Sequence, residues 1–304
     1  MVCIMYVELD QYDRLTETPT SRLYFKDNLI YKVKKKVSDH FISYLSRENR
    51  ITAIERAFSK GVKYSPRLYR ATIDAREPGG SQYEPAICMN YLGPHYTTLF
   101  SHLRRSSSRL ASLDRLLQEI KAFHTRTRVY KETDAVTSAS MEQRFQLLLR
   151  EAESLGVKME GLFIEGYERF VDHYHAEYPA RLAKGYVREL HGDLHTDNIL
   201  FRDDDFIFFD FLDFEETFTA GDIAIDLGFL VSDFCSCEEI YDLDSLLSSI
   251  DNLFHIDLKT LLPLVALGIL NRANTFQLRA DYSHLASGYY RLSTNVMEKY
   301  LKVL

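Results

Sequence analysis

Residues 191–210 constrain the fold of this chain more than any other stretch. A polar run, His191-Gly192-Asp193-Leu194-His195-Thr196-Asp197-Asn198, precedes Ile199-Leu200-Phe201, and the apolar run Phe206-Ile207-Phe208-Phe209 then ends on Asp210. A short apolar run bounded by polar residues is typical of a buried strand. The pattern therefore predicts a polar loop that carries Asp193 and Asn198, followed by a strand that ends on Asp210.

The residue types in this loop suit phosphoryl transfer from ATP. That reaction needs a carboxylate to orient an attacking hydroxyl and oxygen ligands to hold Mg²⁺. Asp193 is the predicted catalytic base, and Asn198 and Asp210 are the predicted metal ligands. His191 and His195 flank the base, and we expect them to brace the loop rather than act as acids or ligands.

Two other interpretations of the loop are weaker. Two His and two Asp within seven residues could bind a transition metal, but the chain has neither an H-E-x-x-H helix nor a Cys/His framework. A simple turn would account for Asp and Asn side chains. It would not explain the second Asp at the end of the next strand. The residues therefore favour a kinase.

The loop from His191 to Phe201 resembles the catalytic loop of the aminoglycoside phosphotransferase and choline kinase superfamily. The following segments, residues 209–216 and Gly221-Asp222-Ile223-Ala224-Ile225-Asp226-Leu227, resemble a prokaryotic branch often fused to a separate P-loop kinase domain; this chain has no G-x-x-x-x-G-K-[ST] motif. The resemblance implies an α+β, protein-kinase-like, two-lobed fold that uses ATP and Mg²⁺. It also implies that Asp226 bonds to the backbone of the catalytic loop.

Residue patterns divide the chain into an antiparallel-sheet N-lobe, residues 1–92, and a mainly helical C-lobe, residues 93–304. The N-lobe pattern predicts a hairpin over 21–37 around Asp27-Asn28, a helix over 41–58, and strands over 68–73 and 85–91. Helical periodicity predicts C-lobe helices near 116–129, 141–149, 163–178, 259–281 and 285–303. The third of these carries an aromatic stripe, which indicates core or a substrate wall.

In the N-lobe a Lys must reach the nucleotide phosphates and a helical Glu must hold that Lys. Lys32 has an apolar residue two positions earlier, as in the kinase pattern V-A-I-K, so it is the predicted lysine. Glu55 on the predicted helix is its expected partner, with Glu48 as the alternative. The lysines at 32, 34, 35 and 36 could instead form a solvated basic edge of the sheet.

Two further stretches are candidates for nucleotide contacts. Glu17-Thr18-Pro19-Thr20-Ser21 resembles an E-T-x-x-S stretch of the same branch, and Thr18 and Ser21 are predicted to contact phosphates, although an ordinary turn is an equal alternative. Residues 89–94 are the predicted connector between the lobes. Main-chain groups at Met89 and Tyr91 would read adenine there, with Ile30 and Met89 as apolar walls.

The acceptor site is predicted from three charged residues: Asp213, Glu216 and Arg272. Surface or packing roles are equally open for each. The combined prediction is an ATP- and Mg²⁺-dependent kinase that phosphorylates a hydroxyl of a small polar molecule. A kinase of protein or RNA hydroxyls is the alternative within enzymes. A regulatory pseudokinase is the alternative outside them, although a binding module has no need of the base Asp193.

The composition of the chain limits the classes of partner and the cellular location that we expect for it. The formal charge of −7 argues against a duplex nucleic-acid partner and favours a cationic or neutral acceptor. The four cysteines, at 3, 88, 235 and 237, match no zinc module. The N-terminus lacks a targeting pattern, and no apolar run approaches the roughly eighteen residues of a membrane span. We therefore expect a cytoplasmic protein with no membrane partner.

Overall fold

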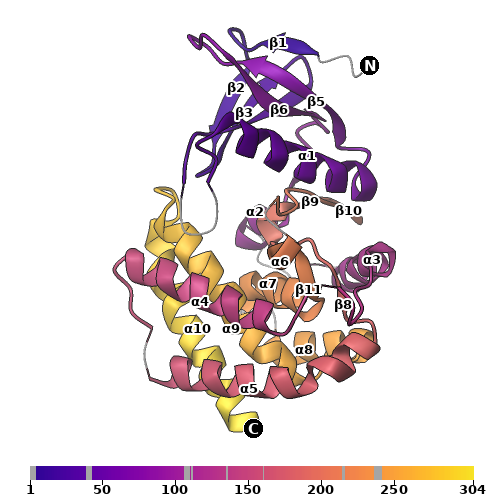
Figure 1. Cartoon of the computed structure of the whole chain (residues 1–304), viewed down its shortest axis with the longest axis vertical. Coiled ribbons are helices and arrows are strands. Elements are labelled where there is room, and N and C mark those ends of the chain that lie inside the picture. Colours follow the sequence, from indigo (N-terminus) through magenta and orange to yellow (C-terminus); the bar gives the residue numbers. More distant parts are fainter. Residues whose placement is uncertain are drawn as a thin grey trace. The chain divides into compact units, whose positions relative to one another are not determined.

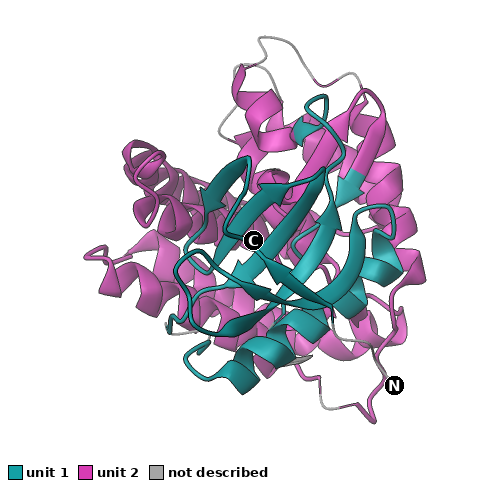
Figure 2. Cartoon of the chain, turned by 90° about the horizontal axis from the view of Figure 1, so that it is seen from above, with its two compact units in different colours: residues 1–97, 207–214 teal, residues 98–206, 215–304 magenta. Residues whose placement is uncertain are grey.

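The computed structural model describes residues 5–38, 43–105, 110, 112–134, 136–159, 161–213, 216–235 and 242–304. The chain forms two compact units, coloured separately in Figure 2. The first comprises Met1–Thr97 and Ile207–Phe214, and the second comprises Thr98–Phe206 and Glu215–Leu304. The division therefore differs from the one predicted near residue 92, because the segment that carries Asp210 belongs to the first unit.

A six-stranded sheet forms most of the first unit (Figure 1). Its strand order is β1-β5-β6-β4-β3-β2. Its strands are β1 (Tyr6–Glu8), β2 (Arg14–Glu17), β3 (Ser21–Lys26), β4 (Leu29–Lys34), β5 (Tyr69–Arg76) and β6 (Tyr83–Asn90). β1 pairs in parallel with β5, and the other neighbours pair antiparallel. The small antiparallel sheet predicted for the N-lobe is confirmed apart from the parallel β1–β5 pair.

The β3–β4 hairpin forms where the sequence predicts it. Asp27 and Asn28 have positive φ values of 54° and 58°, which a two-residue hairpin loop of type I′ requires. The register places Lys32 opposite Leu23 on one side and Ile87 on the other. Because side chains alternate along a strand, Lys32 and Lys34 lie on one face of the sheet, and Tyr31 and Val33 lie on the other.

Helix α1 (Arg47–Tyr64) begins later than predicted. The Ser46 hydroxyl accepts a hydrogen bond from the Asn49 main chain at 3.0 Å, which caps the helix. Tyr44 is held in an extended connection by its main-chain bond to Val37, and residues 39–42 lie outside the described residues. The predicted start at residue 41 is therefore wrong. Leu45, an apolar residue within the predicted helix, is exposed and precedes the Ser46 cap.

The second unit is mainly helical (Figure 1). Its helices are α2 (Leu99–Arg105), α3 (Leu113–Arg126), α4 (Ala139–Ser154), α5 (Leu162–Ala183), α6 (Glu216–Thr219), α7 (Ala224–Cys235), α8 (Leu243–Phe254), α9 (Leu258–Gln277) and α10 (Ser283–Val303). Short strands β8 (Val187–Glu189) and β11 (Ala220–Asp222) pair antiparallel. The 3₁₀ turn η1 (Thr196–Asn198) leads into β9 (Ile199–Arg202), and the division between the units falls within β7 (Thr97–Thr98) and β10 (Asp205–Phe208). The α+β class is confirmed.

Helices α7 and α9 approach closely at two glycines. A Cβ on Gly228 would lie 2.5 Å from the Leu264 main chain, and one on Gly268 would lie 2.8 Å from the Gly228 carbonyl. Any larger side chain would push the helices apart. This close packing matters because α7 and α9 carry the side chains that hold the catalytic loop.

The aromatic stripe lies on α5 and is core. Phe163 and Phe170 are fully buried and Tyr174 is nearly so, which supports the packing interpretation over a substrate wall. Cys88 and Cys235 are buried free thiols, whereas Cys3 and Cys237 lie outside the described residues. No single helix among the described residues is long and apolar enough to cross a membrane; α8 and α9 meet that criterion only as a pair bent by 120°.

Candidate active site

The first half of the catalytic loop is held by Asp226 at the start of α7. Its carboxylate accepts hydrogen bonds of 3.0 Å from the main-chain N–H groups of His191 and Gly192, and it lies 2.9 Å from His124 Nε2. Burial would raise the pKa of Asp226, but the hydrogen bond and charge of His124, together with the other donors, outweigh burial and lower it. Asp226 is therefore an ionised brace that fixes the loop ahead of Asp193.

Asp193 is oriented from both sides and remains partly open to solvent. Its Oδ1 accepts from Asn271 Nδ2 on α9 at 3.2 Å, and its Oδ2 lies 3.3 Å from both His195 Nε2 and Asn198 Nδ2. Burial would raise the pKa of Asp193. The charge and hydrogen bond of His195, followed by the charges of His191 and Arg272, instead hold it well below its usual range. The side chain is 29% exposed, so an ionised carboxylate faces solvent in a fixed orientation.

Asn198 has an orientation that suits a metal ligand. Its Nδ2 donates to the Asp193 main-chain oxygen at 2.9 Å, which directs the amide nitrogen into the loop. Its Oδ1 has no hydrogen bond from the described residues. An amide oxygen left free in this way is the donor type that Mg²⁺ prefers.

The second half of the loop is held by a buried charge network. Asp233 on α7 accepts from the Thr196 main chain at 3.0 Å and hydroxyl at 2.5 Å. Arg272 on α9 donates to Asp233 at 2.8 Å and to Asp197 at 3.3 Å. The Arg272 guanidinium also lies over the rings of Phe100 and Phe276, 4.8 and 4.5 Å from their centroids.

This network corrects the role predicted for Arg272. The side chain is fully buried, and the charges of Asp233 and Asp197 outweigh burial and raise its pKa. It therefore cannot line an open acceptor pocket, and it braces the loop instead. Asp233 and Asn271 were not predicted. Asp233 follows Asp226 by seven residues on the same face of α7, and Asn271 precedes Arg272.

In the first unit, Lys32 forms an ion pair with Asp210. Lys32 is buried in β4, whereas the Asp210 side chain is 41% exposed. The expected pairing of Lys32 with Glu55 is wrong. Glu55 and the alternative Glu48 are both exposed, because the buried face of α1 is formed by Arg50, Ala53, Ile54 and Ala57.

The chain around Asp210 is fastened to the first unit at several points. Asp210 has a φ of 60°, a conformation that costs a non-glycine residue about 1 kcal/mol or more and needs support from its surroundings. Its main-chain N–H donates to the Tyr69 hydroxyl at 3.0 Å. Ser65 and Lys60 donate to the carbonyls of Phe208 and Leu212 at 2.5 and 3.3 Å.

Asp213 completes this attachment, and its predicted contact with the acceptor is wrong. It is buried, with Oδ2 2.5 Å from Lys34 Nζ and Oδ1 2.6 Å from the Tyr44 hydroxyl. A carboxylate committed to a buried cation and a buried hydroxyl is not available to a substrate. The side chain of Glu216, the other predicted acidic contact, lies outside the described residues.

The remaining predicted nucleotide contacts lie in the sheet. The Thr18 hydroxyl accepts from the Ser21 main chain at 3.0 Å and donates back to its carbonyl at 3.2 Å, which tightens the β2–β3 turn. Ser21 is fully buried, so its predicted hydroxyl contact with phosphate is wrong. Met89 is buried opposite Ile30, and the Tyr91 main chain donates to Asn28 at 3.0 Å. The predicted connector thus begins as a continuation of the sheet.

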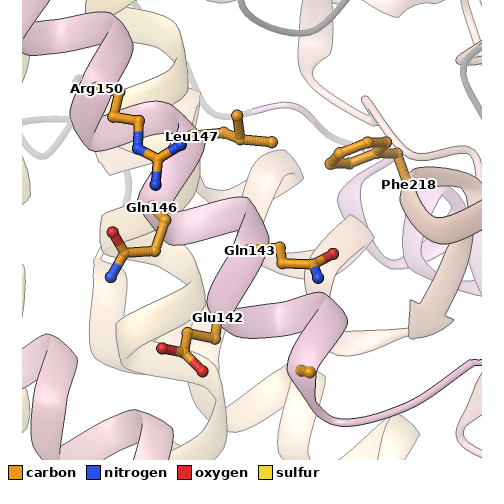
Figure 3. A pocket seen from close by; sticks show the side chains of 7 residues that line it. Glu142, Gln143, Gln146, Leu147, Arg150 and Phe218 are labelled. Atoms are coloured by element: carbon orange, nitrogen blue, oxygen red, sulfur yellow. The ribbon is translucent and has the colours of Figure 1, made fainter.

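A separate cavity of about 390 Å³ lies on α4 (Figure 3). Six residues of α4 between Ala139 and Arg150 line it, with the Phe218 ring opposite them. None of its lining residues belongs to the catalytic loop or to the predicted site. Among the described residues, no group of three or more His, Cys, Asp and Glu side chains could hold a metal ion.

Comparisons with known proteins identify a family and several similar folds. The model of the phosphotransferase enzyme family matches residues 58–243, and no curated protein matches the chain. One similar solved structure is a choline/ethanolamine kinase family protein from Mesorhizobium loti, with 16% identity, a TM-score of 0.50, and coverage of 94% of this chain and 88% of that one.

Two further structures are similar. The GDP and kanamycin complex of APH(2″)-IIIa has 14% identity and a TM-score of 0.56, with 95% and 94% of the two chains covered. Glucosamine kinase in complex with glucosamine, ADP and inorganic phosphate has 15% identity and a TM-score of 0.55, with 95% and 80% covered. At these identities the likeness is one of fold.

Proposed function

The chain belongs to the phosphotransferase enzyme family, and from this premise we propose that it is an ATP- and Mg²⁺-dependent kinase that phosphorylates a hydroxyl of a small polar molecule. The general class, a phosphotransferase with an alcohol group as acceptor, follows from the family. The nucleotide, the metal and the acceptor class are the proposal. Asp193, ionised, partly exposed and oriented from two sides, is the observation that carries it.

In the proposed reaction, Asp193 accepts the proton of the acceptor hydroxyl as the hydroxyl oxygen bonds to the γ-phosphorus. The bond between that phosphorus and the β–γ bridging oxygen breaks, and ADP leaves with the electron pair. The transition state is loose, so placement of the hydroxyl matters more than a strong base. A carboxylate with a depressed pKa is compatible with this role, because its hydrogen bonds fix its direction.

On the nucleotide side, we assign Lys32 to the phosphates and Asn198 and Asp210 to Mg²⁺, which would neutralise charge on the phosphates. The half-exposed Asp210 carboxylate and the unbonded Asn198 oxygen are both hard donors, and both fit that ion. The GDP and ADP complexes of the similar proteins support nucleotide use. Kanamycin and glucosamine in those complexes support a small, polyhydroxylated acceptor.

The decisive experiment measures ATP consumption and phosphorylated product with amino sugars, sugars, amino alcohols, nucleosides, tRNA and a generic protein as acceptors. The wild-type chain should phosphorylate one of the small-molecule classes, and Asp193→Asn should do so about a hundredfold or more slowly. Asp203→Asn is a matched control, because Asp203 is an exposed turn residue. Transfer to tRNA or protein would replace the proposed acceptor class. Nucleotide binding with no transfer to any acceptor would favour a regulatory pseudokinase.

A further inference from the structure

Two lysine–aspartate ion pairs connect strand β4 to the segment that carries Asp210. Lys32 pairs with Asp210, and Lys34, two residues further along the same face of the strand, pairs with Asp213. The pairs differ in exposure, since the Asp213 side chain is 6% exposed and that of Asp210 is 41% exposed. One pair is therefore sealed inside the first unit, and the other is open to solvent.

The sealed pair is fully satisfied by a third side chain. Lys34 Nζ lies 3.2 Å from the Tyr44 hydroxyl, which donates to Asp213 at 2.6 Å, and the Lys34 ammonium lies 4.4 Å from the Tyr44 ring centroid. Lys34, Asp213 and Tyr44 thus form a closed triangle. Burying two charges carries a large desolvation penalty, and apolar replacements of similar volume are often as stable. Stability alone gives no reason for an ion pair here.

The open pair cannot be permanent if Asp210 binds metal and Lys32 binds phosphate. The ion pair would then be broken. The positive-φ conformation of Asp210 would still need support from its surroundings. The attachment that remains must come from neighbouring residues of the segment. Asp213 is such a residue, because its ion pair with Lys34 returns to the same strand as Lys32.

Helix α1 contacts the segment through Lys60 and its C-cap Ser65, but it does not supply an acidic partner for the lysines of β4. Its Glu48 and Glu55 are exposed, and its buried charge is a cation, Arg50, which pairs with Glu84 of β6 at 2.6 and 3.0 Å. The buried face of the helix therefore carries a positive charge, whereas a lysine of β4 requires a negatively charged partner. The anion that β4 needs comes from Asp213 instead.

We propose that Lys34, Tyr44 and Asp213 form a positioning cluster that fixes Asp210 for the metal-bound nucleotide, an inference that rests on the proposed function. The three side chains contact one another, and we assign none of them to the substrate or the metal. They act through the backbone of residues 210–213, as residues behind a metal ligand do when they orient it. The cluster replaces the helix-borne acid that the sequence predicts for Lys32.

Isothermal titration calorimetry of the full chain with ATP, in Mg²⁺ and in EDTA, tests this without turnover. Asp213→Asn should keep its affinity for metal-free ATP and lose about tenfold or more of the additional affinity that Mg²⁺ provides, because residues that orient metal ligands typically contribute on that order. Asp74→Asn is the matched control. It makes the same chemical change in another ion pair of the same unit, that of Asp74 with Arg47, and it should leave the Mg²⁺ effect unchanged.

A double variant, Lys34→Met with Asp213→Leu, guards against simple unfolding, because apolar replacement of a buried ion pair is often neutral for stability. The additional ATP affinity that Mg²⁺ provides should still fall in this double variant, because apolar contacts do not fix the orientation of the segment that carries Asp210. An undiminished Mg²⁺ effect in Asp213→Asn or in the double variant overturns the positioning cluster. An equal loss in Asp74→Asn does so as well. A wild-type chain whose ATP affinity ignores Mg²⁺ overturns the proposed function and the cluster with it.

Discussion

Asn271 Nδ2 lies 3.2 Å from Asp193 Oδ1, so a side chain of α9 directly orients the proposed catalytic base. The other carboxylate oxygen is held from within the loop by His195 and Asn198. Asn271 is itself partly exposed. Both α7 and α9 contact the catalytic loop. The close packing of α9 on α7 therefore helps to position the Asn271 amide that orients Asp193.

Asn271→Ala should lower kcat about tenfold while leaving the KM for ATP nearly unchanged, since a misplaced base costs rate rather than nucleotide affinity. Asn271→Asp should be more damaging, because a second carboxylate beside Asp193 raises its pKa by repulsion. Thr275→Ala, one turn along α9, serves as the control. Steady-state kinetics with the identified acceptor measure all three, and equal kcat in Asn271→Ala and the wild type would remove Asn271 from this role.

Asp193→Asn should reduce turnover by about a hundredfold or more while nucleotide binding persists, because general-base contributions are typically of that size. The amide can still accept from Asn271, so the loop should keep its conformation. Turnover is measured by product formation, and binding by calorimetry. Turnover close to wild type would contradict the kinase mechanism.

The buried ion pair between Arg272 and Asp233 should be costly to break from one side. Arg272→Met leaves Asp233 buried without its cation, and removal of one partner from such a pair typically costs about 3–5 kcal/mol. Arg279→Ala is the comparison, because Arg279 contacts Asp197 from a more exposed position and should cost less than about 1 kcal/mol. Urea denaturation gives both values, and a similar small loss in each variant would show that the network is not needed.

The sequence predicts those parts of the molecule that depend on neighbouring residues. Asp27-Asn28 specifies its hairpin because both positions tolerate positive φ. The polar loop from His191 to Asn198 precedes β9 as the spacing predicts, although β10 ends at Phe208, two residues before Asp210. In each case the information is contained in a few adjacent residues.

The predictions that failed involve contacts between distant segments. Lys34 and Asp213 are far apart in sequence, and nothing local indicates that they meet. The role of Arg272 could not be predicted because its partners, Asp233 and Asp197, lie on segments distant from it in sequence. The predicted Lys32–Glu55 pair is wrong because packing against the sheet determines which face of α1 is buried. The charged residue on that buried face is Arg50.

Acid sensitivity should follow from the carboxylates that hold the catalytic loop. The pKa values of Asp193, Asp197 and Asp226 all lie below their ordinary value in the folded chain. The unfolded chain, with an Asp pKa of about 3.9, therefore binds more protons at acid pH. The stability from these groups is fully present above about pH 5 and is lost as the pH falls through about 4 and below.

Urea midpoints measured between about pH 3 and pH 7 should therefore be flat at the upper end and fall steeply at the lower end. Asp226→Asn should be less stable at pH 7, because its amide replaces an ionised acceptor of three hydrogen bonds, and it should show a shallower decline in acid. Asp203→Asn, an exposed control, should follow the wild type. Parallel acid declines in Asp226→Asn and the wild type would show that another group controls the transition. Because the pKa of Asp193 is lowered, protonation of this carboxylate should not reduce activity above about pH 5, and any loss of kcat there must come from a different residue.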